Sequence, residues 1–179
     1  MRVLDGDALV LDTGQSVRLV GIEAPSAPYR DREGDAGYET AKRLLEDMVL
    51  GREVERRYGG LTRDRYDGAL ARVVTTDALG PRLWLNAEML RKGGARVRVY
   101  PDTAAANGPL LELEMKARTE TRGLWEHGVW IIHDAAALPV DAERFQLPDG
   151  TPVQARGFLR DGRLEVSHPL NLEILGPPT

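Results

Sequence analysis

Short strand patterns alternate with amphipathic helix patterns over the first 125 residues, and this order constrains the fold more than any other feature. Residues 9–11 and 17–22 are apolar and β-branched on either side of the polar turn 12–15, which predicts a β-hairpin. Residues 38–48 carry apolar side chains at spacings of three and four, which predicts a helix that ends at Gly51.

Two more helices are expected after this one. Leu85 and Met89 fall on one face of a helix that ends at Gly93. Pro109 suits the first turn of the other helix because its missing N–H group needs no partner there. The expected apolar stripe of that helix consists of Leu110, Leu113 and Ala117.

Further strands are predicted at residues 53–58, 69–75 and 95–100. Short strands mixed with helices indicate an α+β fold, and a small closed β-barrel with helices beside it fits the pattern well. Periodicity alone does not choose the OB-fold over other small barrels.

The C-terminal part is expected to be separate. Residues 133–142 have the composition of a connection, and residues 152–159 and 163–166 flank a turn sequence typical of a hairpin. Residues 170–174 alternate like another strand. We therefore expect two domains, residues 1–132 and a β-rich extension at residues 133–179.

Composition excludes some classes of protein. The 179 residues contain no cysteine, so there is no disulfide framework and no thiolate zinc site. No apolar run is long enough to cross a bilayer. The formal net charge of −4 is unusual for a dedicated nucleic-acid binder. It does not exclude a local basic groove. Met1 runs directly into a strand pattern, as if a leader had been removed, which favours a periplasmic or secreted location and leaves the cytoplasm open.

Three short segments carry charged residues of interest: residues 4–7, 18–26 and 64–68. Taken singly, each is typical of a turn, a loop or a solvated strand. Their order and spacing, with the helix between the second and third, resemble the staphylococcal nuclease family over residues 3–125. The resemblance implies a five-stranded OB-fold barrel with flanking helices, and a calcium-dependent phosphodiesterase site.

The resemblance also assigns roles to particular residues. Asp7 stands at the calcium-ligand aspartate, Glu23 matches the second carboxylate ligand, and Asp5 lies near both. Arg18 matches the arginine that binds phosphate. Aromatic contacts to a nucleotide are plausible for two further residues, Tyr66 and Tyr100.

Two catalytic positions of the family are altered. Ser26 stands where the general-base glutamate belongs, and Gly68 stands at the second catalytic arginine, next to Asp67 in place of a glycine. A hydroxyl does not replace a carboxylate base, which is worth roughly 10²- to 10⁴-fold in rate. Loss of one charge-stabilising group costs roughly 10²- to 10³-fold more. Three carboxylates in the following loop could substitute for the base: Asp31, Glu33 and Asp35.

Three functional hypotheses follow. The first is a homologue with a degraded active site, which is not an enzyme and serves as a binding or structural module. The alternative is a calcium-dependent phosphodiesterase that cleaves DNA or RNA with weak or rerouted catalysis. The third is an accessory subunit whose partner, or the C-terminal extension, covers an open sheet edge. Calcium is the one cofactor implied, and nucleic acid or a protein is the expected partner.

Overall fold

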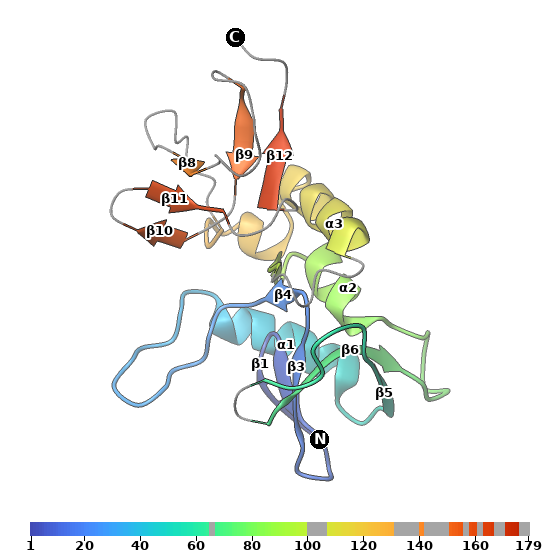
Figure 1. Ribbon diagram of the computed structural model, residues 1–179. Coiled ribbons are helices and arrows are strands. Elements are labelled where there is room, and N and C mark those ends of the chain that lie inside the picture. Colours follow the sequence, from blue (N-terminus) through green and yellow to red (C-terminus); the bar gives the residue numbers. More distant parts are fainter. Residues whose placement is uncertain are drawn as a thin grey trace. The chain divides into compact units, whose positions relative to one another are not determined.

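The computed structural model describes residues 1–64, 67–99, 107–130, 140–141, 151–155, 158–160, 163–166 and 171–175 (Figure 1). The chain divides into two compact units. The first consists of Met1–Arg98 with Asp102–Ile131, and the second of Val99–Pro101 with Ile132–Thr179. No helix among the described residues is long and apolar enough to cross a membrane.

A five-stranded mixed sheet forms the base of the first unit, in the order β1-β2-β3-β6-β5. Its strands are β1 (Arg2–Asp5), β2 (Ala8–Val10), β3 (Ser16–Leu19), β6 (Ala69–Thr75) and β5 (Val54–Arg57). Neighbours run antiparallel except for β3 and β6, which are parallel. Together with the helices this confirms the α+β class.

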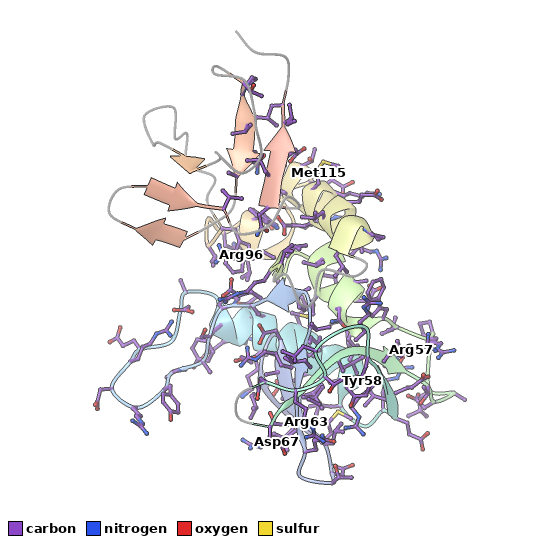
Figure 2. The ribbon with its side chains drawn as sticks, in the orientation of Figure 1. Arg57, Tyr58, Arg63, Asp67, Arg96 and Met115 are labelled. Carbon is purple, nitrogen blue, oxygen red and sulfur yellow. The ribbon has the colours of Figure 1, made fainter. Side chains whose placement is uncertain are left out.

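The predicted closed barrel is not found among the described residues, because the sheet ends in β1 on one side and β5 on the other. Gly21 has a φ of 83°, and this left-handed conformation turns the chain out of the sheet after β3. The next strand, β4 (Ile22–Glu23), pairs with β7 (Arg96–Val97) instead. Edge strand β5 presents charged side chains such as Arg57 outward, which discourages pairing with another chain (Figure 2).

The described part of the first unit also contains three helices and a 3₁₀ turn: α1 (Tyr38–Val49), α2 (Leu85–Arg91), α3 (Asn107–Thr119) and η2 (Gly123–Trp125). Helix α1 packs against β1, and α2 packs between β6 and α3. The predicted helix over residues 38–48 is confirmed, and its buried residues include Ala41, Leu45 and Met48. Gly51 follows this helix with a φ of 75°, as its terminating role requires.

Helix α3 differs from the sequence-based expectation. Leu110 and Ala117 are buried as predicted, but the residue between them on the buried face is Glu114, which is 1% exposed, and not Leu113. The Glu114 carboxylate accepts a hydrogen bond from the backbone N–H of Val97 in β7. A buried carboxylate is tolerated because it has such a donor, and the apolar pattern did not reveal this.

The described residues of the second unit form two small sheets. Strands β10 (Phe158–Arg160) and β11 (Arg163–Glu165) pair antiparallel, and β8 (Val140–Asp141) adds to β11 in parallel. Strand β9 (Val153–Ala155) pairs with β12 (Leu172–Ile174). The predicted hairpin strand over residues 152–159 is therefore two strands in two different sheets. That residues 133–179 form a separate domain stays a prediction.

Asn86, the second residue of α2, joins the helix to the sheet. Its side chain is fully buried, and Oδ1 accepts the N–H of Val73 at 3.0 Å. Its Nδ2 donates to the carbonyl of Val20 at 2.8 Å, at the point where β3 ends. One amide thus satisfies two backbone groups that no regular strand pairing reaches.

We predict that Asn86→Ala lowers the free energy of unfolding by about 2 to 4 kcal/mol, because a backbone N–H and a carbonyl lose their partner. Urea denaturation followed by circular dichroism measures the change. The control is Arg43→Ala at an exposed position of α1, with an expected change within about 0.5 kcal/mol. An Asn86→Ala effect no larger than that of the control would contradict the assigned role.

Candidate functional site

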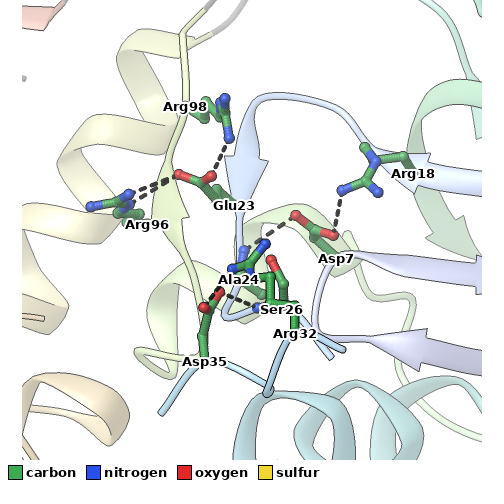
Figure 3. Close-up of polar contacts among 9 residues, drawn as sticks. All are labelled: Asp7, Arg18, Glu23, Ala24, Ser26, Arg32, Asp35, Arg96 and Arg98. Atoms are coloured by element: carbon green, nitrogen blue, oxygen red, sulfur yellow. Dashed lines mark hydrogen bonds and ion pairs between the residues drawn. The ribbon is translucent and has the colours of Figure 1, made fainter. Parts of the chain in front are cut away.

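The site begins at the turn between β1 and β2, where Asp7 is buried (Figure 3). Its Oδ1 accepts a hydrogen bond from Arg18 Nη1 at 3.0 Å, and its Oδ2 accepts the N–H of Ala24 at 3.2 Å. A Cβ at Gly6 would lie 2.7 Å from the Cβ atoms of Ala24 and Ala41. Glycine is therefore needed beside Asp7 so that the turn can approach α1.

Burial raises the pKa of the Asp7 carboxyl well above its ordinary value, and the negative charge of Asp5 adds to this rise. The Arg18 guanidinium and the Ala24 N–H act in the opposite direction without cancelling it. Asp5 Oδ1 also accepts the backbone N–H of Asp7 at 3.2 Å. The structure therefore brings Asp5, Asp7 and Arg18 together, and their roles as metal ligands and as the phosphate-binding arginine stay predictions.

Arg18 lies on β3 between the buried residues Val17 and Leu19. Strand alternation therefore directs its side chain to the opposite face, where 51% of it is exposed. Among the described residues, Asp7 is its polar partner. The side chain is anchored at one nitrogen and remains accessible to an anion from solvent.

Glu23 lies on β4 directly opposite Arg96 of β7. Its Oε2 accepts hydrogen bonds from Arg96 Nε at 3.1 Å and Nη2 at 2.9 Å, and its Oε1 is paired with the Arg98 guanidinium. The guanidinium of Arg96 also lies 4.9 Å from the centre of the Trp130 ring. Both oxygens of Glu23 are thus bound to cations of the protein itself.

Ser26, which the family resemblance places at the general-base position, has a carboxylate from the following loop beside it. Asp35 Oδ2 accepts the N–H of Ser26 at 2.9 Å, and the Asp35 N–H donates to the Ser26 carbonyl at 2.9 Å. Arg32 Nη2 donates to Asp35 Oδ1 at 2.6 Å. The Ser26 hydrogen bond lowers the pKa of Asp35, with Arg32 contributing in the same direction.

Of the three loop carboxylates considered as substitutes, Asp35 is the one bound next to Ser26, while Asp31 and Glu33 are exposed. Sequence reasoning proposed the group of three without choosing among them. A choice was not possible because the hydrogen bonds that close the loop join residues nine positions apart.

Gly68, which the family resemblance places at the second catalytic arginine, closes a tight turn. Its N–H donates to Asp64 Oδ1 at 2.9 Å, and a Cβ on Gly68 would lie 2.8 Å from Asp64 Oδ2. Asp67 adopts a φ of 65°, a left-handed conformation that the family's glycine at this position would adopt easily. Tyr66 and Tyr100, the expected nucleotide contacts, lie outside the described residues.

A calcium site would require several oxygen ligands that are not already committed. Among the residues that the structure describes, no group of three or more His, Asp or Glu side chains is placed to hold a metal ion. Asp7 is bound to Arg18, and Glu23 is bound to two arginines. In this arrangement the side chains do not fit a calcium ion, and the ligand assignment to Asp5, Asp7 and Glu23 stays a prediction.

Sequence reasoning missed the two arginines on Glu23. Arg96 and Arg98 lie on either side of the buried Val97. The signal was available, because charged residues that alternate with an apolar one on a predicted strand share a face. The sequence did not reveal that Glu23 is their partner, because it lies 73 residues from Arg96 and 75 residues from Arg98.

Comparison with known proteins places the chain in a family. Residues 16–127 match the family described as staphylococcal nuclease homologue, and the chain belongs to this family. It is similar to the probable endonuclease LCL3 of Komagataella phaffii, with 31% identity over 114 residues. This match covers 61% of the chain and 48% of that protein, so the chain spans about half the length of this relative.

Asp7 makes a specific pH dependence testable. Its pKa is higher in the folded protein than in the unfolded chain, so the folded state holds the proton more tightly. The stability this provides is present below the unfolded-chain pKa of about 3.9 and is lost as pH rises through the folded-state value. We predict that Asp7→Asn, which does not titrate, gains stability relative to the wild type as pH rises from about 4 to 8.

Urea midpoints across this pH range measure the difference. The matched control is Asp47→Asn, which removes an exposed carboxylate from α1. A difference between Asp7→Asn and wild type that stays flat, or that falls with rising pH, would show that burial does not govern the Asp7 carboxyl.

Proposed function

We propose that this chain is a staphylococcal nuclease homologue that binds the phosphate groups of nucleic acid and does not hydrolyse them at a nuclease's rate. The observation that carries the proposal is the pairing of both retained carboxylates with arginines of the chain. Ser26 and Gly68, in place of the family's base and second arginine, support the same reading. The printed name of the relative, a probable endonuclease, supports nucleic acid as the ligand.

Binding without efficient cleavage follows from what the side chains can do. Arg18 is anchored at one nitrogen and half exposed, which suits a charge-assisted contact to a phosphate oxygen. Hydrolysis also needs a group to take the proton of the attacking water, and the Ser26 hydroxyl does not do this near neutral pH. In this proposal the site keeps Arg18 to bind phosphate and lacks the general base and the second arginine needed for hydrolysis.

Finer points of architecture belong to the same proposal. The strand order β1-β2-β3-β6-β5 and the family support an OB-type arrangement, in which pairing of β1 with β5 would close the barrel. We also propose residues 133–179 as a β-rich domain of its own, supported by the short strands found there.

The first test is incubation of the wild-type chain with labelled single-stranded DNA and calcium. We expect no cleavage that a chelator abolishes, together with binding that weakens as salt rises. Arg18→Ala should weaken binding by about threefold to tenfold in fluorescence anisotropy, because one charge-assisted contact is lost. Arg43→Ala, on the exposed face of α1, is the matched loss of one positive charge. Robust chelator-sensitive cleavage would overturn the proposal.

A second candidate function is a slow phosphodiesterase. It is favoured by one observation, the placement of Asp35 Oδ2 at 2.9 Å from the backbone nitrogen of Ser26. Asp35 would accept the proton of the attacking water in place of the missing glutamate. Its lowered pKa keeps it ionised near neutral pH, as a base must be, but also makes it a weaker base.

Asp35→Asn tests this second candidate, with Asp31→Asn in the same loop as the matched control. If Asp35 is the base, single-turnover cleavage of DNA falls by about 10²-fold or more in Asp35→Asn and is unchanged in Asp31→Asn. Equal rates for the two variants, or an inactive wild type, would exclude Asp35 as a catalytic base.

A further inference from the structure

Strand β7 and the residue that follows it, Arg98, present two guanidinium groups on one face of the first unit. Val97 between them is buried, so strand alternation places the Arg96 and Arg98 side chains together on the opposite side. Figure 3 shows both arginines directed at the carboxylate of Glu23. Two cations held this close repel each other unless an anion lies between them.

The backbone of β7 is held firmly where the arginines emerge. The Val97 side chain is in the core, and its N–H donates to the buried carboxylate of Glu114 in α3. The guanidinium plane of Arg96 is further fixed by the Trp130 ring at 4.9 Å. The Arg96 guanidinium is therefore preorganised, which lowers the ordering cost for an anion that binds to it.

Glu23 fills this position as a phosphate would. Arg96 directs two nitrogens at one carboxylate oxygen, and Arg98 pairs with the other oxygen. Arginine forks bind phosphate in the same way as carboxylate. The cluster adjoins Asp7 and Arg18, because the residue after Glu23 donates its N–H to Asp7.

We propose that Arg96 and Arg98 form a phosphate-binding site that works without a metal ion, and that Glu23 is its internal competitor. This rests on the proposed function and deepens it, since it names the groups that hold the phosphate. A phosphate group displaces the Glu23 carboxylate from the two guanidinium groups. Glu23 would then act as a competitor at the position where the family resemblance expects a metal ligand.

The test uses Glu23→Gln, which keeps the size of the side chain and removes its charge. A 5′-labelled oligothymidylate is titrated in chelator at fixed salt, and fluorescence anisotropy gives its affinity. We expect Glu23→Gln to bind about tenfold more tightly than wild type. Adding Arg96→Ala and Arg98→Ala to this variant should remove the gain. Inorganic phosphate alone should compete with the oligothymidylate, which separates recognition of phosphate from recognition of bases.

The chain offers a matched control. Glu55 on β5 is also paired with two arginines, Arg57 at 3.0 Å and Arg82 at 3.0 Å. Arg57 lies well away from Arg96 in Figure 2. Glu55→Gln therefore makes the same change in net charge at another Arg–Glu–Arg cluster, and we expect no more than about a twofold gain from it.

Equal gains in Glu23→Gln and Glu55→Gln, or no gain in either, would overturn the inference. Arg96→Ala in the otherwise unchanged chain is a second variant in case Glu23→Gln does not fold, and it should weaken binding by about threefold or more. Unchanged binding in Arg96→Ala would also overturn the inference. The proposed function fails separately, through cleavage of the oligothymidylate on a gel in calcium.

Discussion

The Asp7 carboxylate joins three parts of the first unit that are distant in sequence. It belongs to the turn between β1 and β2, it binds Arg18 on β3, and it holds the N–H of Ala24 just after β4. Because it is buried, removing any of these partners would leave part of a charged group unsatisfied. Glu23 is the residue before Ala24, so this contact adds to the pairing of β4 with β7 in fixing its position. One buried carboxylate thus links the first turn, β3 and the end of β4.

The need of a poorly exposed carboxylate for a partner also explains why these acidic residues do not form an open cation site. A carboxylate at low solvent exposure needs a positive partner, and this chain supplies arginines from its own strands. A calcium ion at Glu23 would have to displace two guanidinium groups and then find further oxygen ligands. For a phosphate the arginines are already in place, and it would have to displace the Glu23 carboxylate from them.

Sequence patterns predicted the local elements of the first unit well. The hairpin of β2 and β3 and helix α1 depend on turn residues and on apolar spacing within about a dozen positions, and both are found. Strand β6 has the predicted bounds of residues 69–75. Asp5, Asp7 and Arg18, taken from the first two charged segments, do lie in contact, while their roles stay predictions.

Contacts between distant residues were beyond the sequence. The bend at Gly21 takes β4 out of the main sheet, and the pairing of β4 with β7 then brings Arg96 to Glu23. Glu114 takes a buried position that an apolar pattern assigns to leucine, because one backbone N–H is directed at it. Both outcomes depend on which backbone groups and charges meet in three dimensions, and no spacing rule along the chain contains that information.

Calorimetric titration of the wild-type chain with calcium tests the central claim most directly, since the claim is that arginines of the protein already neutralise Asp7 and Glu23. The account predicts no saturable heat of calcium binding up to millimolar calcium. It predicts the same result at low and at high salt. Saturable binding of one calcium ion that disappears in Glu23→Gln and in Asp7→Asn would contradict it.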